Sequence, residues 1–153
     1  MSVTAAAGFE AAGVAAGLKA GGGPDLALVV NRGPLQHAAA VFTTNRALAN
    51  PIIWSKQAIA DGTVSAIVLN SGGANCFTGA QGFQVTHSTA EAVGEALGVS
   101  PGDVLVCSTG LIGDQLPLGK LVWGVNAAAA GLGDHGEDAS LAIMTTDSRP
   151  KRS

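Results

Sequence analysis

The chain has little charge and no long apolar run. Only 12% of its 153 residues are charged and the net charge is −3, which leaves little charge for a nucleic-acid surface. No apolar run reaches the roughly 18 residues of a membrane helix, and the first basic residue, Lys19, comes too late for a signal peptide. Because 47% of the residues are hydrophobic, a disordered chain is excluded. We therefore expect a soluble, cytoplasmic protein, folded as one domain over residues 1–153, with no membrane or nucleic-acid partner.

Residues that hold metal ions are also scarce. The two cysteines, Cys76 and Cys107, lie far apart, and the sequence contains no Cys-x-x-Cys pair. The three histidines are scattered along the chain at positions 37, 87 and 135, without evident partners. We expect no metal site, and we expect both cysteines to be free thiols.

Short β-branched runs alternate with segments of helical spacing. This pattern predicts an α/β fold of the α+β type, with a mixed, largely antiparallel sheet covered by helices. Residues 1–24, rich in alanine and glycine, are expected to form an irregular lead-in that packs on the domain. Strands are predicted at residues 26–30, 38–42, 52–54, 64–69 and from residue 104, and helices at residues 56–60, 85–97, 118–130 and 137–143. The first two strands, joined by an Asn-Arg-Gly-Pro turn, are expected to form an antiparallel hairpin.

Two glycine-bearing turns follow β-type runs and are the candidate sites for binding an anion or stabilising an oxyanion. The first covers residues 70–75 (Asn-Ser-Gly-Gly-Ala-Asn), and the second covers residues 107–113 (Cys-Ser-Thr-Gly-Leu-Ile-Gly), before a helix start at Pro117. Such turns expose backbone N–H groups that can hold a phosphate, a carboxylate or an acyl-transfer oxyanion. Thr109 can donate its hydroxyl, and Gly110 its N–H, to a developing negative charge. We expect the two turns to lie at equivalent edges of the sheet, where ligand clefts usually form.

Other readings of these turns stay open at this point. Neither turn has the Walker pattern or Gly-x-Gly-x-x-Gly, so nucleotide binding has little support. Ser108 lacks the Gly-x-Ser-x-Gly setting of a serine nucleophile. Thr145 and Thr146 are hydroxyl residues in a polar stretch, where threonine more often caps or packs than binds a ligand. The alternatives are a module that binds a small anion or nucleotide without catalysis, and a plain structural connection.

The two turns, together with residues 142–147 (Ala-Ile-Met-Thr-Thr-Asp), resemble three successive motifs of the glutamate N-acetyltransferase family, also called ornithine acetyltransferase. The resemblance extends upstream through residues 8–14, 25–28 and 41–46 and so covers nearly the whole chain. It implies an enzyme of arginine biosynthesis that moves acetyl from N-acetylornithine to glutamate through an acetyl-threonine. Carried over by motif, Thr109 and Gly110 form the oxyanion hole, and Thr145 contacts substrate.

The resemblance also implies the assembly around the chain. In this family a precursor cleaves itself into an α chain and a β chain that begins with the nucleophilic threonine, and the two form an α₂β₂ heterotetramer without a metal or organic cofactor. Acetyl-CoA is a second acetyl donor in some members. Here Pro150-Lys151 is followed only by Arg152-Ser153, whereas the family's α chain continues to the cleavage site. We therefore expect an α chain cut short, which has no turnover alone.

Overall fold

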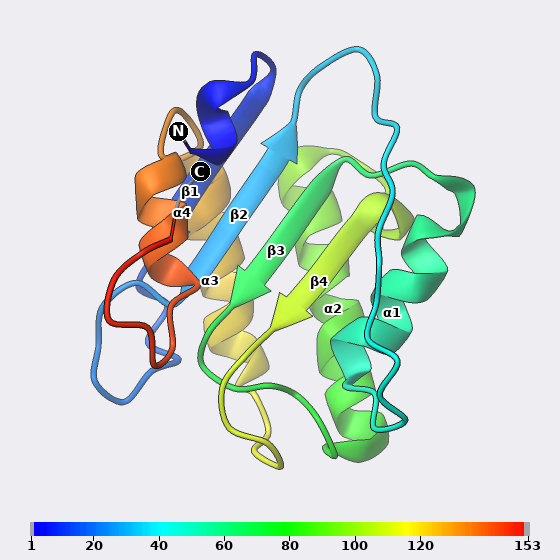
Figure 1. Cartoon of the computed structure of the whole chain (residues 1–153), viewed down its shortest axis with the longest axis vertical. Coiled ribbons are helices and arrows are strands. Elements are labelled where there is room, and N and C mark those ends of the chain that lie inside the picture. The colour runs from blue at the N-terminus through cyan, green and yellow to red at the C-terminus, as the bar shows by residue number, and fades with distance from the viewer. Residues whose placement is uncertain (1, 152–153) are drawn as a thin grey trace.

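A four-stranded sheet forms the centre of the molecule in the computed structural model, which describes residues 2–151 (Figure 1). The strands follow one another in the order β1-β2-β3-β4. β1 pairs antiparallel with β2, β2 pairs antiparallel with β3, and β3 pairs parallel with β4. The strands are β1 (Phe9–Val14), β2 (Leu26–Asn31), β3 (Ala66–Asn70) and β4 (Val104–Ser108). The expected mixed, largely antiparallel sheet covered by helices is confirmed.

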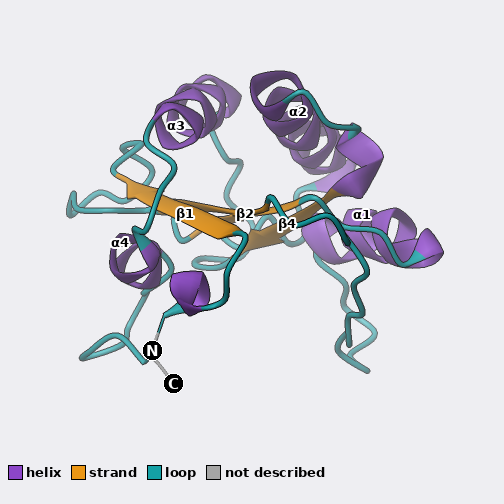
Figure 2. Ribbon diagram, turned by 90° about the horizontal axis from the view of Figure 1, so that it is seen from above, coloured by secondary structure: helices purple, strands orange, loops and turns teal. Residues whose placement is uncertain are grey.

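The helices divide between the two faces of the sheet and one of its edges (Figure 2). Two long helices, α2 (Gly79–Leu97) and α3 (Leu118–Ala130), cover one face side by side. On the opposite face, α4 (Gly136–Ala142) and the short 3-10 turn η1 (Val3–Ala5) lie near β1 and β2. Helix α1 (Asn50–Ala58) lies beside β4 and is followed by the 3-10 turn η2 (Ile59–Asp61), and a third such turn, η3 (Pro101–Asp103), leads into β4.

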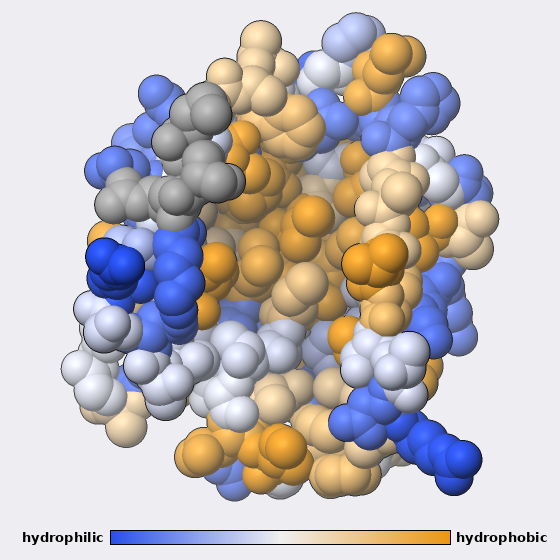
Figure 3. Space-filling model, viewed as in Figure 1, coloured by the Kyte–Doolittle hydropathy of each residue, from blue (hydrophilic) through white to orange (hydrophobic). Residues whose placement is uncertain are grey.

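The main core lies between the sheet and the α2–α3 layer. Alternate residues of β2 and β3 point into it, because successive side chains of a strand face opposite sides of a sheet. Leu26, Leu28 and Val68 from the sheet meet Val93 of α2 and Val125 of α3, and all five are almost fully buried. On the opposite face, Val29, Ile67 and Leu69 are only partly buried. Figure 3 shows this face as an apolar hollow in the middle of the molecule.

Both edges of the sheet are closed by other parts of the chain. At the β4 edge, the Ser55 hydroxyl donates to Val106 O (2.9 Å) and accepts from Val106 N–H (3.0 Å). Trp54 Nε1–H donates to Val104 O (2.9 Å), so that two side chains of α1 occupy backbone groups that another strand could bind. At the β1 edge, the backbone of Ala11 exchanges two hydrogen bonds with Gly133 (2.8 and 3.2 Å). Neither edge therefore offers the long row of unpaired backbone groups that invites another strand.

The expected hairpin between residues 26–30 and 38–42 is wrong. Residues 38–42 form no strand, and β2 pairs instead with β1, which falls in the expected irregular lead-in. β1 carries small residues because α4 packs directly on it: a Cβ at Gly13 would collide with the backbone of Asp138. The close packing of α4 requires small side chains in β1. Because small side chains give no pattern of large apolar residues, the apolar periodicity of the sequence did not predict this strand.

One other predicted strand and one helix start also differ from expectation. The predicted strand at residues 52–54 is wrong, since these residues belong to α1, where Pro51 occupies the first turn. A short apolar run does not separate a strand from a buried helical segment. Helix α2 begins at Gly79, six residues before the predicted start, because two glycines in its first turn weakened the helical signal. No helix among residues 2–151 has the length and apolar character needed to cross a membrane.

Candidate functional site

The two glycine-bearing loops lie next to each other at one end of the sheet. Because β3 and β4 run parallel, their carboxyl ends meet at the same edge, and the loops that follow them lie together. Three backbone hydrogen bonds of 2.9 Å join the loops: Thr109 N–H to Asn70 O, Ala74 N–H to Leu111 O, and Gly113 N–H to Cys76 O. The expectation that both turns lie at equivalent edges of the sheet is confirmed.

Gly110 occupies a backbone position that excludes other residues. Its φ is +134°, which L-residues rarely adopt, and a Cβ there would lie 2.8 Å from both Cα and N of Gly73. The two glycines therefore fix how closely the loops approach. Gly110 itself is exposed, and within residues 2–151 its N–H has no hydrogen-bond partner. It is a free, rigidly held donor.

Thr109, the other predicted donor, is exposed beside it. Its backbone N–H is occupied by Asn70 O, which leaves the side-chain hydroxyl as its available donor. That hydroxyl makes no hydrogen bond to any residue that the structure describes. The Thr109 hydroxyl and the Gly110 N–H are thus consecutive free donors at a strand end, an arrangement suited to developing negative charge.

Thr145 lies on a third segment, after α4. It is exposed, and its backbone N–H donates to Asp147 Oδ2 (3.3 Å). The start of this segment is tied to the first loop, where the Ser71 hydroxyl donates to Ala142 O (2.5 Å). Within the described residues, no hydrogen bond joins Thr145 to Thr109 or Gly110. The structure thus brings the three segments to one region, without a hydrogen bond between Thr145 and the Thr109–Gly110 pair.

Asp147 anchors the segment that contains Thr145. Its carboxylate accepts from Lys151 Nζ and from the Thr145 N–H. The hydrogen bond from Lys151 is the largest cause that lowers the pKa of Asp147 below its usual value, followed by the hydrogen bond from Thr145. The ionised carboxylate therefore helps to hold the backbone of Thr145.

A buried carboxylate that the sequence reading missed organises the loop between β1 and β2. Asp25 is fully buried, and its oxygens accept from the N–H groups of Ala16 (2.6 Å), Leu18 (2.6 Å) and Lys19 (3.0 Å). Its own backbone oxygen accepts from Ser71 N–H (2.9 Å). Lys19 Nζ in turn donates to Met144 O (2.6 Å). Asp25 thereby links this loop to the other site segments. In the sequence it was marked only by its position before a strand and by the resemblance at residues 25–28, neither of which indicated this role.

Three exposed apolar side chains lie on or next to the two site loops: Phe77 (72% exposed) just after the first loop, and Leu111 (72%) and Ile112 (63%) on the second. Phe77 has a φ of +59°, which is uncommon for a residue other than glycine. Its loop is held by the buried Asn75, whose amide donates to Thr86 Oγ1 (2.8 Å) and accepts from the Thr78 hydroxyl (2.6 Å). The free donors at Thr109 and Gly110 therefore stand beside an apolar rim.

Neither cysteine is in a disulfide. Partial burial raises the pKa of the Cys107 thiol, so that the neutral thiol is favoured at the end of β4. Among residues 2–151, no group of three or more His, Cys, Asp or Glu side chains is placed to hold a metal ion. The donors available at the loops are therefore hydroxyl and backbone groups.

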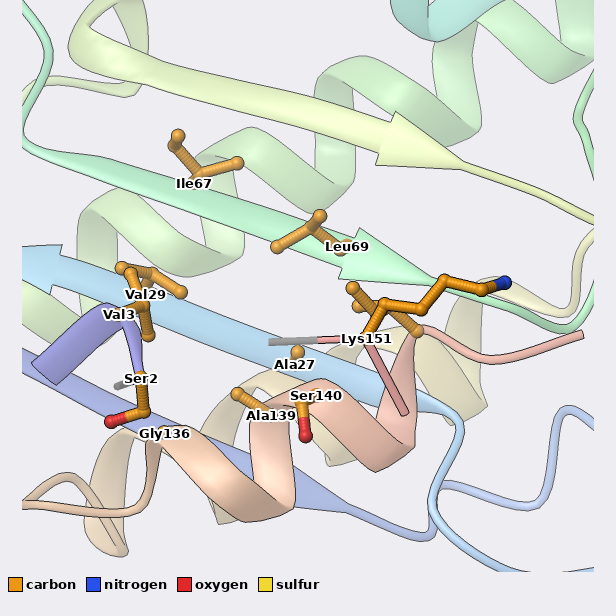
Figure 4. A pocket seen from close by; sticks show the side chains of 11 residues that line it. Ser2, Val3, Ala27, Val29, Ile67, Leu69, Gly136, Ala139, Ser140 and Lys151 are labelled. Carbon is orange, nitrogen blue, oxygen red and sulfur yellow. The ribbon is translucent and has the colours of Figure 1, made fainter. Parts of the chain in front are cut away.

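A separate groove of about 440 Å³ lies on the open face of the sheet (Figure 4). Val29, Ile67 and Leu69 form its floor, and α4 forms one wall with Ala139 and Ser140. Its lining is mostly apolar, with few groups that could orient a small ligand. Thr109, Gly110 and Thr145 are not among its lining residues, so the groove and the donor turn are different places on the molecule.

Comparison with known proteins gives one consistent result. A model of the ArgJ family matches residues 10–153. The chain is 59% identical over its whole length to the arginine biosynthesis bifunctional protein ArgJ of Streptomyces coelicolor, and 58% identical over 99% of its length to the protein of that name from Thermobifida fusca. It spans 40% of the length of each of these relatives.

Solved structures agree with the sequence comparison. The crystal structure of ornithine acetyltransferase complexed with ornithine from Mycobacterium tuberculosis matches with a TM-score of 0.95 and 51% identity, covering 97% of this chain and 81% of that chain. The crystal structure of arginine biosynthesis bifunctional protein argJ from Bacillus halodurans matches with a TM-score of 0.87 and 32% identity, covering 97% and 78%.

Proposed function

The chain belongs to the ArgJ family, and from that premise we propose that it is the α-chain part of an acetyltransferase of arginine biosynthesis. The enzyme moves acetyl from N-acetylornithine to glutamate in the cytoplasm. The single observation that carries the proposal is the pair of free donors, the Thr109 hydroxyl and the Gly110 N–H, on a turn that resembles a motif of the family. The bound ornithine in the Mycobacterium tuberculosis relative supports the substrate class.

The proposed reaction has two acyl-transfer steps. A threonine hydroxyl of the β chain attacks the acetyl carbonyl, the C–N bond breaks, and ornithine leaves after its amine takes a proton. The amine of glutamate then attacks the acetyl-threonine ester, which gives N-acetylglutamate and restores the hydroxyl. Both steps pass through a tetrahedral oxyanion. Thr109 and Gly110 stabilise that charge, by about 3–4 kcal/mol per donor in comparable enzymes.

The β chain is the partner in this proposal, in an α₂β₂ assembly formed by self-cleavage. The lengths of the relatives support this partner. The chain covers 81% of the solved chain from Mycobacterium tuberculosis but 40% of the protein from Streptomyces coelicolor, so the solved chain is about half as long as that protein. The apolar hollow lined by the partly buried Val29, Ile67 and Leu69 also supports a partner, because a large apolar patch at the surface often marks an interface.

Thr145 has a substrate-binding role in the proposal. Its segment is held near the first loop by Ser71 and near the β1–β2 loop by Lys19, which supports a place in the same site. The chemistry needs neither a metal nor an organic cofactor, since hydroxyl and backbone groups supply the nucleophile and the donors. Acetyl-CoA is proposed only as a second acetyl donor.

Trapping the acyl-enzyme tests the proposal. The complete enzyme is incubated with N-acetylornithine in the absence of glutamate, and each chain is weighed by intact-mass spectrometry. We expect one acetyl group on a threonine of the partner chain, together with a burst of ornithine. The 153-residue chain alone is expected to show no transfer, because the nucleophile lies on the partner.

Variants of Thr109 link this chemistry to the turn. Thr109→Val removes the hydroxyl and is expected to slow acylation about a hundredfold, whereas Thr109→Ser retains it and keeps most of the rate. Acetyl transfer without an acetyl-enzyme, or a wild-type rate for Thr109→Val, contradicts the proposal. Specific binding of a nucleotide to the complete protein in isothermal titration, without acetyl transfer, favours the alternative of a binding module.

A further inference from the structure

Asn70, at the end of β3, is a buried amide whose hydrogen bonds are incomplete. The residue is 4% exposed. Its Nδ2 donates to Ser108 Oγ at 2.7 Å and reaches Cys107 O at 3.5 Å. Its Oδ1 is buried and has no hydrogen-bond partner among the described residues. Burying an acceptor without a donor costs stability, so the amide at this position carries a cost that an apolar side chain would avoid.

The backbone of Asn70 holds the same turn as its side chain. Asn70 O accepts from the N–H of Thr109 at 2.9 Å, while Nδ2 holds the side chain of Ser108. Asn70 therefore binds the two residues that directly precede Gly110. After Gly110 the turn is held from the other loop, by Ala74 N–H on Leu111 O.

We propose that Asn70 is a positioning residue for the acetyl-transfer site. By fixing Ser108 and Thr109 at the end of β4, it keeps the Thr109 hydroxyl and the Gly110 N–H in one relative position. The inference rests on the proposed function of those two donors. Preorganised donors stabilise a transition state only when their positions are fixed before the reaction, and a misplacement of about 1 Å can cost about a hundredfold in rate.

The position of Asn70 on β3 allows a structural role of its amide to be distinguished from a positioning role. Its side chain lies on the same face of the strand as Ala66 and Val68, which point into the main core. A leucine, which branches at the same carbon with the same number of heavy atoms, is apolar like that face and would leave no unpaired oxygen. A purely structural role thus predicts that leucine is tolerated, whereas a positioning role predicts a stable protein with impaired chemistry.

The experiment uses the complete enzyme with the double substitution Asn70→Leu and Ser108→Ala. Because both members of the hydrogen bond and the unpaired oxygen are removed together, we expect an unfolding midpoint no lower than that of the wild type. We expect kcat to fall about tenfold to a hundredfold, with KM for N-acetylornithine unchanged, because Asn70 is buried beneath the turn and acts through it. Ser108→Thr alone keeps the hydroxyl and is expected to retain kcat.

Ser55→Ala is the matched control. Ser55 is also buried and also binds β4, but at Val106 and from the α1 side. Its loss is expected to lower the unfolding midpoint and to leave kcat unchanged. A wild-type kcat in the Asn70/Ser108 double variant, or a fall in kcat that follows only from partial unfolding, overturns the inference.

Thr109→Val in the same enzyme separates the two proposals. If Thr109→Val is slow while the Asn70/Ser108 variant is as fast as the wild type, the donor site stands and only the positioning role of Asn70 is wrong. If Thr109→Val also has the wild-type rate, the proposed function of the turn fails, and the role of Asn70 fails with it.

Discussion

Replacing Gly110 with alanine in the complete enzyme tests the donor turn where the two loops touch. A Cβ at Gly110 would lie 2.8 Å from Cα and N of Gly73, whereas ordinary contacts begin at 3.4 Å, so the loops must separate by about 0.6 Å. The φ of +134° adds backbone strain of about 1–3 kcal/mol. Since a 1 Å misplacement of reacting groups costs about a hundredfold, we expect kcat to fall about tenfold to a hundredfold.

Gly113→Ala is the control for this prediction. Gly113 lies on the same loop with a φ of +93°, but nothing lies within 4 Å of its Cβ position, and its N–H is already bound to Cys76 O. Both variants should lose stability in thermal unfolding, at about 2–4 °C per kcal/mol. Only Gly110→Ala should lose kcat in an assay of ornithine release. A wild-type kcat for Gly110→Ala, or equal losses in both variants, refutes the reasoning.

Three further predictions concern stability and charge. Asp25→Ala leaves three backbone donors without their buried acceptor and should cost at least about 3 kcal/mol in urea unfolding; a loss below about 1 kcal/mol contradicts this role. In α3, Gly124→Ala should destabilise, since its Cβ would lie 2.7 Å from the Cβ of a core alanine, whereas Gly119→Ala, with open space, should stabilise by up to about 1 kcal/mol. Lys151→Ala should raise the pKa of Asp147, measured by NMR titration. Because that pKa is lowered in the folded chain, the contribution of Asp147 to stability is present above its usual pKa and is lost as the pH falls through the folded value.

The sequence predicts those elements whose signal is local. β3, β4, α3 and α4 appear within about two residues of their predicted bounds, because β-branched runs and helical spacing are dense there. Residues 38–42 show the limit of such reasoning, since Val41 is 99% exposed although its run is apolar. β1 was missed for the opposite reason: its small residues make room for α4, and that contact joins distant parts of the chain.

The features of the candidate site also fall into those that the sequence predicts and those that it does not. The two turns and their common edge follow from strand–turn patterns. That the Thr109 N–H is occupied while its hydroxyl is free depends on the register of β3 against β4. The partnerless oxygen of Asn70 and the three donors on Asp25 depend on side-chain packing that no local pattern encodes. The role of Thr145 stays a prediction.

The closed edges of the sheet also bear on how copies of the chain can associate with one another. A protein that displays an apolar sheet face is at risk of aggregation, and the most damaging route is strand-by-strand growth from an open edge into a fibril. The Ser55 hydroxyl on Val106 and the backbone of Gly133 on Ala11 occupy both growth points. These contacts oppose the addition of a strand at either edge, while the apolar face between them stays open.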